Sequence, residues 1–253
     1  MRIVGVIEAR MGSTRRPGKV LAEVVGKPLL ELIVERLARS RRIDEIVVAT
    51  SVEERDRAIE ALAGMLGVSC YRGSEEDVRL RVLEAVRSVG GELIVQIGGD
   101  QPFPDWELND ELVAIYLDGG YDYVANALVQ TYPLGIVAQV YSTRILAETE
   151  ELTRDSRDRD GTSDYIWQHP ERYRLCNKEA PPELTAPDIR LTVDYPEDLE
   201  VVELVYEALY GANPAFTTRD ILALFAANPE WREINGHLVH NNRIQWQPGG
   251  EAG

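Results

Sequence analysis

The sequence predicts an α/β fold in which helices cover both faces of a mostly parallel β-sheet. In the first half of the chain, short apolar runs rich in β-branched residues alternate with longer amphipathic segments. The runs are hydrophobic at nearly every position, which is typical of strands buried on both faces. Connections of this length are typical of the right-handed crossovers that join parallel strands.

Four strand–helix units fill the first half. The segment 27–40 illustrates the helical pattern, because Leu30, Ile33 and Leu37 recur on one face and Pro28 suits a first turn. The expected strands are 2–7, 45–50, 68–72 and 92–98, and the expected helices are 27–40, 53–66, 75–89 and 106–118.

The second half is less regular. A charged loop over 153–164 precedes an aromatic helix start near Tyr165. No repeat or linker divides the chain, so we expect one domain over residues 1–228 and a C-terminal tail over 229–253 that ends in disorder. The expected strands are 121–128, 135–142 and 189–194, and the expected helices are 196–211 and 218–228.

Composition restricts the class of protein. A formal net charge of -16 over 253 residues argues against a nucleic-acid partner, which needs a basic face. No apolar run approaches the roughly 20 residues that span a bilayer, and the first run is too short for the core of a signal peptide. Two cysteines make no disulfide framework. We therefore expect a cytoplasmic protein with no membrane or nucleic-acid partner.

The segment EARMGSTRRPGKVLAE (8–23) contrasts with this acidity. It follows the first expected strand, and parallel sheets bind ligands at the carboxyl ends of their strands. Gly12 and Gly18 allow main-chain amides to approach an anion closely. The order of residues matches neither GxxxxGK[ST] nor GxGxxG. Phosphate binding and a solvated basic loop both stay open. The basic residues are Arg10, Arg15, Arg16 and Lys19.

Two aspartates also follow apolar runs directly. Asp100 comes after the expected strand 92–98, and Asp194 ends the expected strand 189–194, so both could reach the same edge of the sheet. Mg²⁺ takes one or two carboxylates together with phosphate oxygens. Each aspartate also has a structural interpretation, Asp100 as a turn residue and Asp194 as the start of a capping box with Glu197.

Several separated motifs then resemble one family. The motifs ARMGSTRRPGKVL (9–21), YRGSEEDV (71–78), IVQIGGDQP (94–102), YDYVAN (121–126) and RLTVDYPEDLE (190–200) resemble the cytidylyltransferases that make CMP-activated sugars. The spore coat polysaccharide synthesis branch is most similar, and the CMP-Kdo and CMP-sialic acid synthetases are more distant. The resemblance covers about residues 1–210. It implies a three-layer α/β/α, Rossmann-like nucleotidyltransferase fold with a small extension for dimerisation and acceptor binding, placed here at 128–180.

The resemblance also implies site residues. The loop would bind the CTP triphosphate, with Arg15 and Lys19 as catalytic cations. We expect Arg16 to face solvent. Asp100 would be catalytic and, with Asp194, would bind Mg²⁺. The implied nucleotide-binding residues are Ala9, Arg10, Gly12, Ser13, Arg15, Lys19, Arg72, Gly73, Ser74 and Gln96.

The acceptor region departs from the family pattern. LGIVAQVY (134–141) stands where close relatives read R-G-x-D-x-E-V-F, so Val137 replaces an Asp and Gln139 a Glu. Gly161 stands where relatives carry a His. Fixed polar groups set acceptor specificity, so the acceptor stays open. The remaining candidates for an acceptor pocket are Tyr121, Tyr123, Asn126, Tyr132, Arg157, Arg159 and Trp167.

The implied reaction is transfer of CMP from CTP to an acidic sugar or sugar-like acceptor, with release of pyrophosphate, by a magnesium-dependent homodimer. Alternatives are a non-sugar acceptor such as a phosphonate or small alcohol, another nucleotide, or a nucleotide-binding scaffold without transferase activity.

Overall fold

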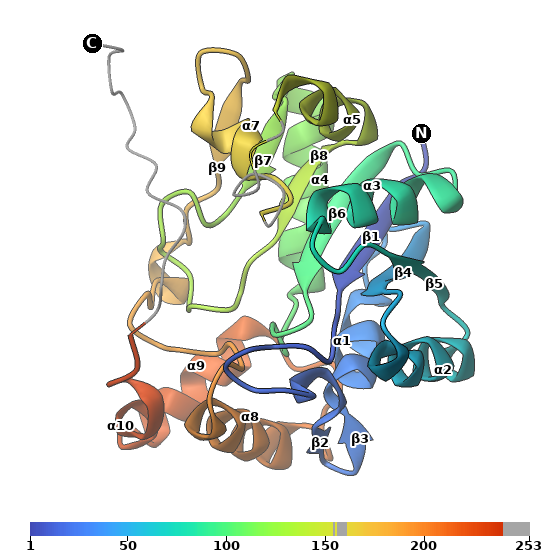
Figure 1. Cartoon of the computed structure of the whole chain (residues 1–253). Coiled ribbons are helices and arrows are strands. Elements are labelled where there is room, and N and C mark those ends of the chain that lie inside the picture. Colours follow the sequence, from blue (N-terminus) through green and yellow to red (C-terminus); the bar gives the residue numbers. More distant parts are fainter. Residues whose placement is uncertain (154, 156–160, 240–253) are drawn as a thin grey trace.

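A seven-stranded sheet forms the centre of the computed structural model, which describes residues 1–153, 155 and 161–239 (Figure 1). The strand order is β5-β4-β1-β6-β8-β7-β9. The strands are β1 (Ile3–Glu8), β4 (Glu45–Ser51), β5 (Ser69–Gly73), β6 (Leu93–Gly98), β7 (Tyr123–Ala125), β8 (Gln139–Ser142) and β9 (Leu175–Asn177); β2 (Glu23–Val24) and β3 (Lys27–Pro28) form a separate pair.

The sheet is mostly parallel, as predicted. β1 pairs in parallel with β4 and with β6, β4 pairs in parallel with β5, and β7 pairs in parallel with β9. β8 runs antiparallel to both β6 and β7. The carboxyl ends of β1 and β6 therefore lie side by side, with Glu8 in register with Gly98.

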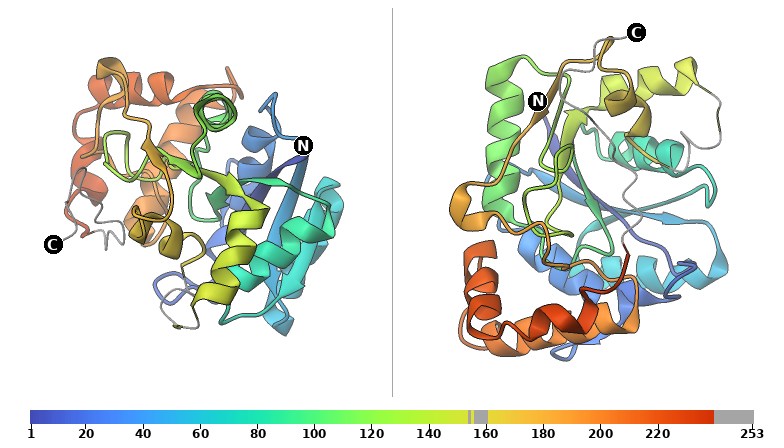
Figure 2. Two further views of the ribbon diagram at one scale, coloured as in Figure 1. Left: turned by 90° about the horizontal axis from the view of Figure 1, so that it is seen from above. Right: turned by 90° about the vertical axis from the view of Figure 1, so that its left-hand side faces the viewer.

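Two hydrophobic cores lie on opposite faces of the sheet, which gives the predicted α/β/α layers (Figure 2). Successive side chains of a strand point to opposite faces. In β1, Ile3 and Ile7 pack with one core, whereas Val4 and Val6 pack with the other. The strands are buried on both faces for this reason, and this explains their unbroken hydrophobic runs.

The helices divide between the two faces. The first core takes side chains of α1 (Leu29–Leu37), α2 (Arg57–Leu66), α4 (Trp106–Gly119), α8 (Pro196–Leu209) and α9 (Thr218–Ala227), and the second those of α3 (Val78–Ser88), α5 (Thr143–Leu152) and α7 (Asp164–Gln168). Short 3₁₀ turns form η1 (Lys19–Leu21), η2 (Glu54–Asp56) and η3 (Pro182–Leu184).

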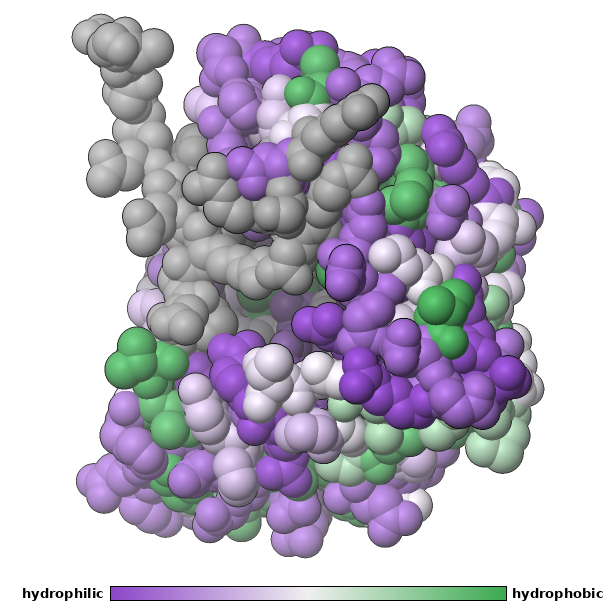
Figure 3. Space-filling model, in the orientation of Figure 1, coloured by the Kyte–Doolittle hydropathy of each residue, from purple (hydrophilic) through white to green (hydrophobic). Residues whose placement is uncertain are grey.

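The surface is mostly hydrophilic on the face shown in Figure 3, where hydrophobic residues occur singly or in small groups. Scattered apolar residues of this kind are normal on a protein surface. In the described part of the chain, no helix is both long and apolar enough to cross a bilayer.

Some predicted elements differ from the structure. The expected strand 189–194 is wrong, because this segment makes only an isolated bridge between Arg190 and Leu134. Leu191 and Val193 are fully buried beside the sheet, so the apolar run reflects burial without strand pairing. The strands expected over 121–128 and 135–142 shorten to β7 and β8, and α5 and β9 were not predicted.

The segment after residue 228 also differs from the expected tail. It begins with α10 (Trp231–Asn235), and the Trp231 ring packs edge-on against Phe225 with ring centroids 5.9 Å apart. Asn235 is buried. The end of the chain for which disorder was predicted, 247–253, lies outside the described residues.

Candidate nucleotide and metal site

The loop after β1 is held in a fixed path at the carboxyl edge of the sheet. Asp56 Oδ1 accepts a hydrogen bond from the main-chain N–H of Met11 (2.8 Å), and Met11 O accepts one from the N–H of Gly18 (2.9 Å). Gly18 adopts a left-handed conformation with φ of 75°, which favours glycine, and so turns the chain into η1. This turn delivers Lys19 to the site with its side chain only 9% exposed.

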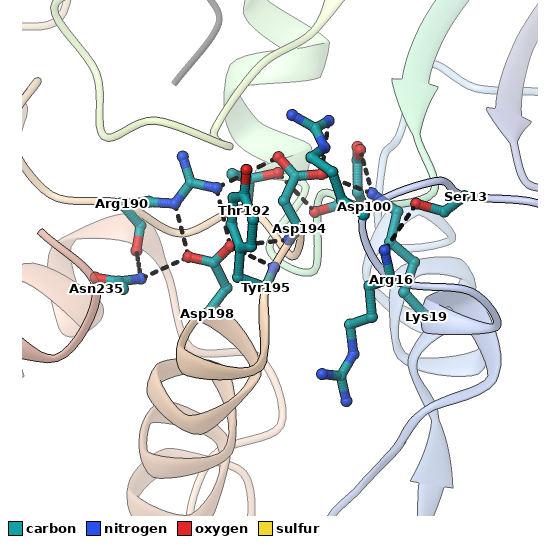
Figure 4. A network of polar contacts seen from close by, with 11 residues as sticks. Ser13, Arg16, Lys19, Asp100, Arg190, Thr192, Asp194, Tyr195, Asp198 and Asn235 are labelled. Carbon is teal, nitrogen blue, oxygen red and sulfur yellow. Dashed lines mark hydrogen bonds and ion pairs between the residues drawn. The ribbon is translucent and has the colours of Figure 1, made fainter. Parts of the chain in front are cut away.

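Lys19 joins the two predicted metal-binding aspartates. Its Nζ lies 2.8 Å from Asp100 Oδ2 and 2.9 Å from Asp194 Oδ1 (Figure 4). Arg15 Nη2 lies 2.8 Å from the same oxygen of Asp194. The two predicted phosphate-binding cations and the two predicted metal-binding carboxylates thus form one cluster.

Main-chain hydrogen bonds bring the two aspartates together. The N–H of Val193 donates to Asp100 O (2.9 Å), and the Thr192 hydroxyl donates to the same oxygen (3.1 Å). The segment before α8 therefore runs beside the loop after β6, although the two are far apart in the sequence. This tether replaces the strand pairing that the sequence led us to expect.

The charges of this cluster determine the protonation of Asp100. Burial by itself raises the pKa of this carboxyl group. The ammonium group of Lys19, through its charge and its hydrogen bond, outweighs that effect and holds the pKa of Asp100 below its usual value. Asp100 is therefore a carboxylate at neutral pH, the form that binds a metal ion.

Arg190 and Asp198 hold Asp194 from the opposite side. Arg190 Nη2 lies 3.3 Å from Asp194 Oδ2, and the guanidinium also binds both carboxylate oxygens of Asp198, at 2.6 and 2.9 Å (Figure 4). Asn235 of α10 donates to Asp198 Oδ1 at 3.0 Å. A continuous chain of polar contacts therefore connects α10 to Lys19.

The capping box that we predicted at Asp194 and Glu197 is displaced by one residue. Tyr195 is the N-cap of α8, and Asp198 Oδ2 accepts the N–H groups of both Asp194 and Tyr195. Asp194 does not cap the helix itself. Its carboxylate is consequently directed at the cations of the loop.

The residues present fit a magnesium ion. Asp100 and Asp194 are two hard oxygen ligands within hydrogen-bond distance of one nitrogen, and Mg²⁺ commonly takes one or two carboxylates and completes its shell with water and phosphate. Across residues 1–153, 155 and 161–239, no three His, Cys, Asp or Glu side chains group as a closed metal site. The pair thus suits a metal ion that is shared with a bound phosphate.

The predicted nucleotide-binding residues form two groups that meet. Arg10 Nη1 lies 3.7 Å from Glu75 Oε1, which joins the loop to the segment after β5. A Cβ atom at Gly12 would lie 2.9 Å from the same Glu75 oxygen, so a larger residue there would displace the Glu75 and Arg55 side chains. Ala9 is buried, and its main-chain N–H donates to Ala49 O of β4 (3.2 Å).

Other predicted nucleotide residues have local structural partners. Ser13 Oγ accepts the N–H of Arg16, and Ser74 Oγ accepts the N–H of Asp77. Gly73 is in close contact with neighbouring side chains, where a Cβ atom would lie 2.9 Å from Tyr71. The guanidinium of Arg16 points away from the aspartates (Figure 4), but the residue is half-buried, whereas Arg15 is exposed.

Arg72 is the predicted residue that fits its role least. Its guanidinium donates to the main-chain oxygens of Ser51 (3.1 Å), Val52 (2.9 Å) and Glu53 (2.8 Å), and it pairs with Glu60 (3.1 Å). These bonds fix the chain after β4. A contact with a nucleotide would require some of them to break.

Most candidates for an acceptor pocket are packing residues. Tyr123 and Tyr132 are buried, and Asn126 uses its side-chain amide to bind Ile136 O (2.7 Å) and the N–H of Ala138 (2.9 Å). Trp167 is buried as well, and Tyr121 packs against the core. Arg157 and Arg159 lie outside the described residues.

A network of side-chain hydrogen bonds in two parts lies on the sheet, and the candidate Tyr123 belongs to one part. Gln96 Nε2 donates to Glu8, Tyr141 donates to Gln96 Oε1 (2.5 Å), and Gln139 Oε1 accepts Tyr123 (2.8 Å) and Ser163. Gln96 was predicted to bind the nucleotide, and here its amide is committed to this network.

Sequence reasoning did not identify Glu8, Asp56, Arg190, Asp198 or Asn235 as parts of the site. Asp198 carried a signal, because it stands one turn after Asp194 at a helix start, where an acid accepts main-chain N–H groups. The position of Asn235 has no such local signal, since its contacts arise only from the packing of α10.

The comparison with known proteins identifies the family. The sequence profile of the cytidylyltransferases matches residues 4–209. The chain belongs to the cytidylyltransferase family. This cytidylyltransferase-family protein is 35% identical over 235 residues to the spore coat polysaccharide biosynthesis protein SpsF of Bacillus subtilis. The aligned region covers 90% of this chain and 95% of the relative.

Solved structures of cytidylyltransferases share the fold. A cytidylyltransferase from Leptospira borgpetersenii superposes with a TM-score of 0.86 at 28% identity, over 95% of this chain and 99% of that one. A CMP:2-keto-3-deoxy-manno-octonic acid synthetase in complex with CTP superposes with a TM-score of 0.62 at 20% identity. The superposition covers 83% of this chain and 100% of that one. The family and the α/β fold inferred from the motifs are both confirmed.

Proposed function

We propose that this protein transfers CMP from CTP to a hydroxyl group of an acidic sugar or sugar-like acceptor and releases pyrophosphate. The observation that carries the proposal is the cluster in which Arg15 and Lys19 meet Asp100 and Asp194 at the carboxyl edge of the sheet. Cations and carboxylates in contact at one place suit a triphosphate and a magnesium ion that bind together.

The reaction follows from this arrangement. Phosphate oxygens of a bound nucleotide would take the place of the aspartates at Arg15 and Lys19, and Asp100 and Asp194 are the residues that would hold Mg²⁺. When bound, the ion supplies positive charge that offsets the charge of the phosphates. An acceptor hydroxyl attacks the α-phosphorus, the bond from that phosphorus to the β-phosphate oxygen breaks, and the hydroxyl proton passes to a base or water.

Positioning and electrostatics provide the catalysis in this proposal. Arg15 and Lys19 stabilise the negative charge that develops on the phosphoryl oxygens. The polar chain through Arg190 and Asp198 keeps Asp194 in place. No covalent enzyme intermediate is needed, because the hydroxyl attacks the phosphorus directly.

The test measures pyrophosphate release with each of the four nucleoside triphosphates, Mg²⁺ and a panel of acidic sugars that includes 2-keto-3-deoxy-manno-octonic acid. Release with CTP and an acidic sugar is expected, and Asp100→Asn should abolish it. Asp118→Asn is the matched control, because Asp118 is exposed near the carboxyl end of α4, apart from the contacts that hold Asp100 and Asp194. Release with UTP or GTP and not with CTP would contradict the proposal, and CTP binding without release would favour a scaffold.

We also propose a cytoplasmic homodimer with the region 128–180 at its interface, on the basis of the family resemblance. Light scattering after size-exclusion chromatography tests it, and a monomer at micromolar concentration would contradict it.

A further inference from the structure

Glu8 lies beside the segment that carries Asp100, and its carboxylate has no role in the proposed reaction. It is the last residue of β1, and the nucleotide loop begins immediately after it. Its main-chain oxygen accepts the N–H of Gly99 (2.8 Å), so Glu8 lies beside the segment that carries Asp100. Thr162, next to the altered position Gly161, reaches its side chain from the acceptor region.

Only one oxygen of the Glu8 carboxylate has protein donors. Oε1 accepts hydrogen bonds from Gln96 Nε2 and from Thr162 Oγ1 (3.1 Å). No donor in the described part of the chain reaches Oε2, and Oε2 is not among the buried atoms that lack a partner. The second oxygen of this half-buried carboxylate can therefore still accept a hydrogen bond from a ligand.

No cation forms an ion pair with this carboxylate within the described residues. Arg81 acts on Glu8 through its charge, but its Nη1 donates to the main-chain oxygens of Ser74 (2.5 Å) and Glu75 (3.3 Å). Half-buried carboxylates usually have a cation or a full set of donors. Burial raises the pKa of Glu8 against the opposing effects of Arg81, Thr162 and Gln96, so one more donor would stabilise the charged form.

The neighbours of Glu8 hold it in a fixed orientation. Gln96 is itself oriented by Tyr141, and Gln96 stands in register with Gln139 across β6 and β8. Gln139 is the position where the resembling family carries a glutamate, and Ser163, next to Thr162, binds its side chain. Gln139 therefore lies across the strand pair from Gln96, the residue that binds Glu8, although no hydrogen bond among the described residues joins the two sets of side chains.

We infer that Glu8 binds the acceptor, with Oε2 accepting a hydrogen bond from a hydroxyl group of a polyhydroxylated substrate. This inference rests on the proposed function and names the chemistry that its acceptor site recognises. Glu8 precedes the loop that carries Arg15 and Lys19, and its side chain binds Thr162, the neighbour of the altered position Gly161. It therefore selects the acceptor and takes no part in holding CTP.

The variant Glu8→Gln tests the inference by a change of polarity. Because Gln96 and Thr162 both donate to the Oε1 position, the amide oxygen of the variant is fixed there, and its NH₂ group occupies the Oε2 position. A hydrogen-bond acceptor becomes a donor, with no change of shape. Glu45→Gln is the matched control, since Glu45 is a strand glutamate at the amino end of β4, away from the site.

Two measurements separate the possible outcomes. The KM for the most active acidic sugar of the panel should rise about 10- to 100-fold in Glu8→Gln, because one hydrogen bond to a charged group is lost. The affinity for CTP, measured by calorimetry, should stay within about twofold of wild type. Saturation-transfer NMR with the same sugars reports binding without turnover. Sugar binding that Glu8→Gln weakens supports the inference even if no nucleotide is transferred, which would refute the proposed function alone.

Other results would overturn the inference. An unchanged KM and unchanged sugar binding in Glu8→Gln would remove Glu8 from the acceptor site and leave the proposed function intact. A wild-type protein that binds none of the sugars would also refute it. A parallel fall in CTP affinity and melting temperature would show that Glu8 supports the fold of the nucleotide loop instead.

Discussion

Asp198 offers the most direct test of how the site is supported. Its side chain is fully buried and accepts hydrogen bonds from Arg190 Nε and Nη2, from the N–H groups of Asp194 and Tyr195, and from Asn235 Nδ2. In Asp198→Asn one oxygen becomes an NH₂ group facing donors, and buried Arg190 loses its bidentate partner. Breaking a buried ion pair costs about 3–5 kcal/mol.

This cost predicts a clear thermal effect. For a domain of this size, 1 kcal/mol corresponds to roughly 2–4 °C in melting temperature, so Asp198→Asn should melt about 6–20 °C below wild type. Calorimetry and urea denaturation at pH 7 measure the change. Asp188→Asn is the control, because its ion pair with Arg232 is exposed and such pairs contribute about 1 kcal/mol or less.

The same variant has a pH signature. Burial tends to raise the pKa of Asp198, but the hydrogen bonds and charge of Arg190 lower it below its usual value. A depressed folded-state pKa stabilises the protein above the unfolded pKa of about 3.9, and this stability is lost as pH falls through the folded-state value. The gap between wild type and Asp198→Asn should therefore shrink below about pH 4. A loss under about 1 kcal/mol at pH 7 would refute the reasoning.

Three further predictions concern single positions. Gly135→Ala should destabilise the protein by more than about 2 kcal/mol in urea denaturation, because φ is 102° and a Cβ atom would lie 2.7 Å from the main chain of Leu191; a neutral effect would contradict this. Arg72→Ala should lose about 2–4 kcal/mol of stability with CTP affinity unchanged by calorimetry, and weakened CTP binding in a stable variant would restore its predicted nucleotide role. Burial and the charge of Glu60 raise the pKa of Cys70 to about 11. Iodoacetamide at about pH 8 should therefore alkylate Cys70 more slowly than a free thiol, as followed by mass spectrometry. Equal rates would refute the raised pKa.

Sequence periodicity predicted the strands and helices whose burial is visible in the local pattern of apolar residues. The run at β6 is apolar because both faces are covered, and its short length between two helical segments predicted a strand. The run at 189–194 carries the same signal without sheet partners, since burial and pairing produce the same composition. α5 was missed because its buried face is short, and its clearest signal is the Ser142 side chain that accepts the N–H of Ile145.

Some residues of the candidate site could be predicted from local sequence, and others could not. Asp100 and Asp194 were predicted as a pair because both follow apolar runs at the same edge, and the structure brings them to one lysine. The roles of Arg190 and Asn235 could not be predicted, because they depend on how α8 and α10 pack together. Arg72 resembled a ligand residue in the motif, but hydrogen bonds to nearby carbonyl groups occupy its guanidinium.

The contact between Asn235 and Asp198 makes the geometry of the site depend on a helix outside the family motifs. The family profile ends at residue 209, yet Asn235 donates both to Asp198 and to the main-chain oxygen of Arg190 (3.1 Å). Two proteins with identical motif residues can therefore differ in how rigidly Asp194 is held, if their C-terminal helices differ. Substitution or engineering of this terminal helix is a route to adjusting the site without altering any residue that would touch a nucleotide.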